Sequence, residues 1–162
     1  MNPPQPIIPM SVPKFIEELK KTFMLHAVAA HFSNGLIPVA VLYLLLTLPA
    51  RDVYFEHTVE NLLVIVLMAI PVSFLSGIRD WKTKYKGAKA PVFTKKIRLS
   101  IVLFSLCLIA VSIRLTVPGV MNGTGILFLA YTASLLLMLP VVVLLGHYGG
   151  KLSSGQRQEK FR

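Results

Sequence analysis

Three of the four histidines of this chain lie in or beside long apolar segments, where a polar ring is costly to bury. His26 lies five residues after Lys21, and His147 lies four residues before Lys151, so both lie about 6 to 8 Å inside a basic residue that would anchor the helix at a membrane surface. His31 lies deeper in the first apolar segment. Each imidazole therefore needs a partner, a bound ligand or a water path.

The spacing of these histidines is compatible with two interpretations, haem ligation and hydrogen bonding within the bundle. Helical geometry places His31 about 140° around the helix from His26, so the two cannot both face one small ligand. If the first and last apolar segments are neighbours, an imidazole from each, His147 with either His26 or His31, can hold haem iron from opposite sides. The alternative is that these histidines form hydrogen bonds with the backbone or with one another. A zinc site is disfavoured because no thiolate or carboxylate lies nearby.

The residues around these histidines are compatible with a flat cofactor. Small residues that leave room for a macrocycle or for close helix packing are Ala27, Ala29, Ala30, Ser33, Asn34, Gly35, Gly146, Gly149 and Gly150. Asp80, Trp81 and Asn34 are candidates for orienting a ligand, with Asp80 holding a histidine, a quinone or a propionate partner. The other interpretation of Asp80-Trp81 is a helix end with an interfacial tryptophan. No motif for hydrolytic or nucleotide-dependent chemistry is present.

The elements that must position these residues are membrane helices. The chain has 162 residues, of which 54% are hydrophobic and only 15% charged, a composition outside the range of soluble domains. We predict an all-α, integral membrane four-helix bundle with spans at 24–48, 61–78, 97–117 and 126–146, forming one domain over 24–148. A short amphipathic helix is expected in an N-terminal interfacial segment (1–23), and residues 149–162 form a polar tail. The turn-rich segment 118–125 predicts a tight reversal, so spans three and four should be antiparallel neighbours.

Charge gives the predicted orientation. The N-terminal segment, the connection between spans two and three, and the tail hold three, eight and four of the 17 basic residues. The positive-inside rule places both termini and this connection in the cytoplasm, so the chain is predicted to be a multi-pass protein of the inner membrane. Glu56 and Glu60 are assigned to an exposed outer connection, as is a solvated His57. Arg114, near the end of span three, is expected to extend to the lipid headgroups.

The basic residues also bear on partners. The basic residues interrupt apolar runs rather than forming a patch on a polar fold. The lipid bilayer is therefore an expected partner, and nucleic acid is not. The basic connection 79–98 is either a docking site for an acidic partner, another redox subunit or anionic lipid, or simply a determinant of topology. The single cysteine, Cys107, excludes a disulfide within the chain.

Several motifs resemble a family of small four-helix bacterial membrane proteins catalogued as a domain of unknown function. The segment from His26 to Leu36 (HAVAAHFSNGL) is similar to the family opening H-x-x-x-x-H-F-P-x-G-L, with Ser33 in place of proline. The stretches 77–81 (GIRDW) and 149–152 (GGKL) also match. Some relatives end in G-H-x-G-G and are joined to cytochrome-type modules, and the segment 146–150 (GHYGG) is similar to that ending. This resemblance implies haem b and electron transfer. The family's histidine at the start of span three is replaced here by Lys95-Lys96, which leaves helices one and four to provide ligands.

The sequence thus supports two hypotheses of different class. The first is a membrane subunit that binds haem b through His147 and either His31, favoured by the motif, or His26, favoured by depth. It would be a non-catalytic anchor of a larger redox complex that exchanges electrons with quinone. The second is a cofactor-free accessory subunit that docks a partner through its basic connection.

Overall fold

Four long helices make up almost all of the described chain. The computed structural model describes residues 25–50 and 52–159, and the predicted N-terminal interfacial segment 1–23 lies outside them. The helices are α2 (Leu25–Ala50), α3 (Val53–Lys84), α4 (Pro91–Thr116) and α5 (Ile126–Glu159), with a short 3-10 helix η1 (Val120–Asn122) before α5. The predicted all-helical, four-helix architecture is confirmed.

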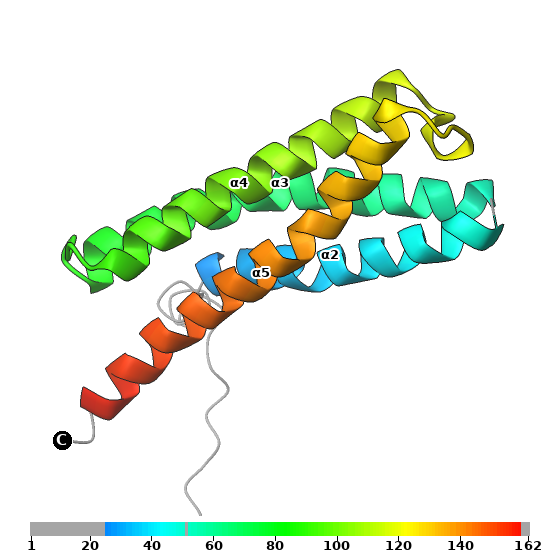
Figure 1. Cartoon of the computed structure of the whole chain (residues 1–162). Coiled ribbons are helices and arrows are strands. Elements are labelled where there is room, and N and C mark those ends of the chain that lie inside the picture. Colours follow the sequence, from blue (N-terminus) through cyan, green and yellow to red (C-terminus); the bar gives the residue numbers. More distant parts are fainter. Residues whose placement is uncertain (1–24, 51, 160–162) are drawn as a thin grey trace, which may run out of the picture.

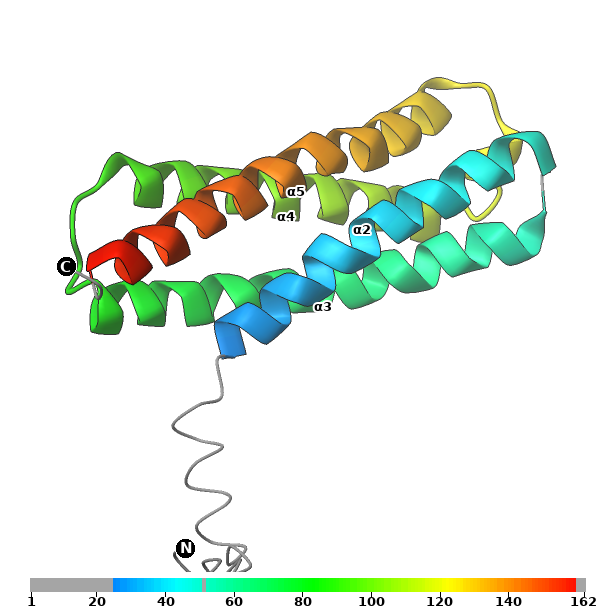
Figure 2. The ribbon, with the colours of Figure 1, turned by 90° about the horizontal axis from the view of Figure 1, so that it is seen from below.

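The helices form an up-and-down bundle. Each helix packs on the next along the chain, and α5 closes the ring by contacting α2 (Figures 1 and 2). The short segment between α4 and α5 reverses the chain, so these two helices are antiparallel neighbours as predicted. The first and last helices are therefore adjacent. Such adjacency is needed for any site that combines His147 with His26 or His31.

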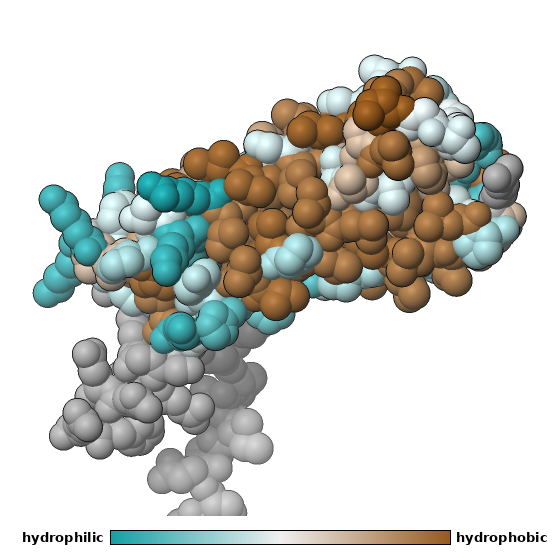
Figure 3. Space-filling model, in the orientation of Figure 1, coloured by the Kyte–Doolittle hydropathy of each residue, from teal (hydrophilic) through white to brown (hydrophobic). Residues whose placement is uncertain are grey.

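The bundle is apolar both inside and outside. Its core is a strip of aliphatic side chains from all four helices, among them Ile37, Leu44, Leu63, Leu103 and Leu135. Many large apolar side chains also point outward, and on the face seen in Figure 3 they form a continuous band with hydrophilic residues at both ends. All four helices are long and apolar enough to cross a bilayer of about 30 Å. Such a surface is stable against lipid rather than water.

The two ends of the bundle differ in composition. We call the end where α3 leads into α4, near the end of α5, the basic end; its exposed cations include Arg79, Lys82, Lys95, Arg98 and Lys151. The opposite end, where α2 leads into α3 and α4 leads into α5, is called the acidic end, after Asp52, Glu56 and Glu60. In Figure 1 the basic end is on the left.

Helices α3 and α5 are longer than the membrane spans predicted within them, because they continue beyond the apolar runs. The second helix begins at Val53 rather than 61, since the carboxylate of Asp52 accepts a hydrogen bond of 2.8 Å from the Tyr54 amide and caps the helix. The same helix continues to Lys84, so the non-helical part of the basic connection is only 85–90. At the other end of the chain, α5 continues past 146 into the predicted tail.

Candidate functional site

A cavity of about 410 Å³ opens at the basic end of the bundle. We call it the basic-end cavity. All four helices contribute to its lining. The polar and charged lining residues that matter below are His26, His31, Asn34, Asp80, Trp81 and Lys96.

His26 is held in this cavity by a contact with α3. Its Nδ1 lies 2.8 Å from the carbonyl oxygen of Ser73. Because a carbonyl can only accept, Nδ1 must carry the proton, and the neutral ring then has its lone pair on Nε2. Metal-binding histidines are commonly oriented in this way, with one ring nitrogen donating to a carbonyl and the other left for the metal.

The His26 ring requires a glycine on α3. A Cβ atom at Gly77 would lie 2.9 Å from Cε1 and 3.1 Å from Nδ1 of His26, which is closer than such contacts allow. Any larger residue at this position must displace the ring or separate the helices. Ser73 and Gly77 were not identified as site residues from the sequence. The only signal for Gly77 in the sequence is its position in the 77–81 motif.

His31 lies at the edge of the same cavity. It is exposed, and it also lines a shallow outer groove with Phe32 and Gly35. The angular argument predicted that His26 and His31 cannot both face one small ligand. Both nevertheless line this cavity. The cavity is wide enough to contact two different faces of α2, one with His26 and one with His31.

His147 does not line the cavity. The lining residues of α5 include Gly146, Gly149 and Gly150, which share one helix face, and His147 follows the first of them by about 100°. Its ring is exposed and packs edge-to-face against Tyr148 with centroids 5.6 Å apart. The structure therefore brings His26 and His31 to one site but does not add His147 to it.

The other predicted residues do lie at the cavity. Asn34, Asp80 and Trp81 all line it. The Trp81 indole donates a hydrogen bond of 2.9 Å to the Ala88 carbonyl and packs near Phe93, with centroids 5.9 Å apart. Trp81 thus closes the 85–90 connection as well as lining the cavity. Lys96 also lines the cavity. It was not identified as a site residue from the sequence, where its charge indicated only the orientation of the chain in the membrane.

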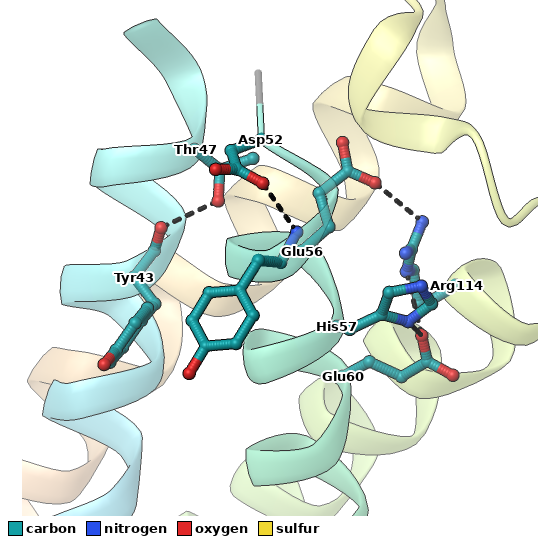
Figure 4. Close-up of polar contacts among 8 residues, drawn as sticks. Tyr43, Thr47, Asp52, Glu56, His57, Glu60 and Arg114 are labelled. Atoms are coloured by element: carbon teal, nitrogen blue, oxygen red, sulfur yellow. Dashed lines mark hydrogen bonds and ion pairs between the residues drawn. The ribbon is translucent and has the colours of Figure 1, made fainter. Parts of the chain in front are cut away.

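A second polar cluster, which we call the acidic-end ion cluster, joins α3 to α4. Nη1 of Arg114 lies 3.2 Å from Oε2 of Glu56, and its Nε lies 3.3 Å from Oε2 of Glu60. Figure 4 shows the guanidinium between the two carboxylates, with His57 beside Glu60; His57 Nδ1 is 3.4 Å from Oε2 of that residue. Arg114 is only 3% exposed and Glu56 only 4%.

These positions correct two predictions. Arg114 does not extend to the headgroups, because two carboxylates one helix away neutralise it inside the bundle. Glu56 and Glu60 do not belong to an exposed connection, since both lie on α3 after its first residue, and Glu56 is buried. A charge inside an apolar bundle is tolerated when it is paired, and all three residues satisfy that condition here.

The described residues contain no ready-made site for a single metal ion. Within residues 25–50 and 52–159 the structure groups no three histidine, cysteine or acidic side chains that could hold a metal ion by themselves. This does not bear on a haem, whose iron needs one or two protein ligands.

No protein-family model matches the chain, and neither a curated protein nor a solved structure is significantly similar to it. The family resemblance therefore stays a prediction, and the arguments that follow rest on the site itself.

Proposed function

We propose that this protein is a membrane subunit that binds haem b in the basic-end cavity and transfers electrons within a larger redox complex, with quinone as an exchange partner. In this proposal the chain lies in the inner membrane with both termini in the cytoplasm, following the charge distribution. The haem would supply reversible one-electron chemistry. The protein would supply an iron ligand, a low-dielectric enclosure and a fixed position.

The geometry of His26 carries the proposal. Its bond to the Ser73 carbonyl fixes the ring and leaves the Nε2 lone pair as the metal-binding atom. The ring lines a cavity that also contains apolar and aromatic side chains, including Ile70, Phe74 and Leu103, which suit the faces of a porphyrin. This observation favours His26 over His31 as the iron ligand from α2.

The neighbouring glycines support the same proposal. Gly146, Gly149 and Gly150 leave the α5 wall of the cavity without side chains, so a flat ring can approach the helix backbone. A second residue to hold the haem would be either His31, which lines the cavity, or His147, which lies one position outside the lining face. Either would need to turn toward the iron, whereas His26 is already held.

The test is an optical titration of the purified protein with haem b. We expect a reduced-minus-oxidised spectrum of a b-type haem for the wild type and its loss in His26→Ala. His57→Ala is the matched control, because His57 lies at the acidic end and should leave the spectrum unchanged. The same spectrum in His31→Ala and in His147→Ala identifies the second ligand. A wild-type protein that binds no haem, or a His26→Ala variant with an unaltered spectrum, would overturn the proposal.

A specific observation favours a second candidate function, a cofactor-free subunit that docks a partner. Tyr148 lies under the ammonium of Lys95 at 5.6 Å, and His147 packs on the same tyrosine, so this part of the basic end presents an exposed group of aromatic and cationic side chains. Aromatic residues such as Tyr148 are enriched in protein interfaces. This candidate predicts that His147→Ala changes no spectrum and that reversing the charge of Lys95 releases a co-purifying subunit.

A further inference from the structure

We propose that Lys96 gives the basic-end cavity an anion subsite, so that its occupant is a membrane amphiphile with a carboxylate or phosphate group. The proposal deepens the haem function, since haem b carries two propionates, but it depends only on the cavity and its charges. Anionic lipid is the other source of the same chemistry.

Lys96 lies in the second turn of α4 and reaches across to α5. A Cβ atom at Gly149 would lie 3.9 Å from its Nζ atom. Lys96 also lines a smaller recess of the same region together with His26 and Trp81. Its ammonium group therefore lies inside the wall of the cavity, between two helices, and not on the outer surface.

Several of the other polar groups in the lining already have partners. The Ser33 hydroxyl donates to the Ala30 carbonyl, and the Trp81 indole donates to Ala88. His26 uses Nδ1 on Ser73, and Asp80 has an interaction of its own. In the part of the chain that the structure describes, Lys96 forms no hydrogen bond or ion pair. It is thus a cation that lines the cavity with its donors unused.

An unpaired ammonium in a partly buried cavity favours an anionic ligand for two reasons. Hydrogen bonds to a charged donor are about twice as strong as neutral ones, and a low-dielectric wall strengthens the attraction further. The exposed cations Arg79, Lys82 and Arg98 at the same end add a positive field that concentrates anions near the opening. A neutral quinone would not gain from this electrostatic attraction.

The preceding residue provides a matched control. Lys95 is also a lysine of the first turns of α4, but it is exposed and its ammonium lies over the Tyr148 ring, outside the lining of the cavity. Lys95→Met and Lys96→Met therefore remove the same charge from the same end of the bundle. Only the second change removes it from the cavity.

The test measures ligand binding by these two variants and by Lys96→Arg. Purified protein is titrated with haem b, and in a separate arm it is reconstituted with phosphatidylglycerol or phosphatidylcholine and the retained lipid is counted by native mass spectrometry. We expect Lys96→Met to weaken haem binding roughly 10- to 100-fold, the range for a lost hydrogen bond to a charged group, and Lys96→Arg to restore most of it. Lys95→Met should bind as the wild type does. Unchanged circular dichroism and melting show that each variant is folded.

The outcomes separate this inference from the proposed function. If wild type and Lys96→Met bind haem equally and retain phosphatidylglycerol equally, the anion subsite is overturned while the haem function stands. If the wild type binds no haem but retains phosphatidylglycerol over phosphatidylcholine in a Lys96-dependent way, the haem function fails and the subsite holds phosphate. If the wild type binds neither, both are overturned.

Discussion

The two ends of this bundle place charged groups among apolar helices in opposite ways. At the acidic end, Arg114, Glu56 and Glu60 are paired with one another across α3 and α4. At the basic end, His26 and Lys96 line an open cavity, and each retains bonding capacity after its protein contacts are counted. Paired charges hold helices together, whereas the Nε2 lone pair of His26 and the ammonium group of Lys96 remain available to a ligand.

This difference has a physical origin in packing. On α3 and α4, Val59, Ala110 and Val111 are buried together with Glu56 and Arg114, so the guanidinium lies inside the packed bundle. Around His26 the cavity is lined by glycines of α3 and α5, which have no side chains to fill it. The acidic end should therefore determine stability, and the basic end should determine binding. Three substitutions test this division.

The largest expected effect comes from Arg114→Met. The change leaves two carboxylates in an apolar bundle without their cation, and breaking a buried ion pair in this way costs about 3 to 5 kcal/mol. Unfolding by heat or denaturant in detergent micelles measures the loss. Haem binding per folded molecule should stay unchanged, because the substitution is far from the basic-end cavity.

Two controls sharpen this result. Arg98→Met removes an exposed cation from the same helix and should change stability little. The triple variant Glu56→Gln, Glu60→Gln, Arg114→Met removes all three charges and should recover much of the stability. An Arg114→Met protein as stable as Arg98→Met would contradict a buried, paired guanidinium.

A smaller effect on stability, with a larger one on binding, is expected from Gly77→Ala. The added methyl group would lie 2.9 Å from His26 Cε1, so it displaces the ring and weakens its bond to Ser73. Overpacking of this kind costs about 1 to 3 kcal/mol. Gly35→Ala is the matched control, because nothing lies within 4 Å of a Cβ atom there and alanine favours a helix. Equal melting temperatures and equal haem affinities for the two variants would argue against the close contact.

The smallest effect is expected from Trp81→Phe. Phenylalanine keeps an aromatic ring beside Phe93 but cannot donate to the Ala88 carbonyl, so the variant should lose about 1 kcal/mol. Hydrogen exchange of the amides at 85–90 reports on the connection directly, and faster exchange is expected there. A loss of haem binding without faster exchange would instead assign Trp81 to the ligand.

Much of the fold could be predicted because it depends on local patterns. Apolar runs of sufficient length predict spanning helices, and the turn residues 118–125 predict the reversal between α4 and α5. The ends of the helices could not be predicted from the apolar runs where a helix continues into polar sequence. Asp52 caps α3 before its apolar run begins, and the turn after Lys84 depends on Lys86 and Gly87, both of which have positive φ.

The site was less predictable because it depends on which face each helix turns to its neighbours. His26 could be placed at a particular depth, but its partner Ser73 is 47 residues away and becomes visible only when α2 packs on α3. The rotation of α5 decides that Gly146 lines the cavity and that His147 does not. Arg114 was assigned to the headgroups from its distance to the helix end, a measure that ignores the carboxylates on the adjacent helix.

The order of the helices around the ring also constrains how the protein is made. α2 with α3, and α4 with α5, can pair as soon as each second helix has been synthesised, because their connections are short. The cavity draws its walls from all four helices, so it is complete only when α5 has joined α2. A ligand that needs all four walls of the cavity would therefore bind only after the whole bundle has formed.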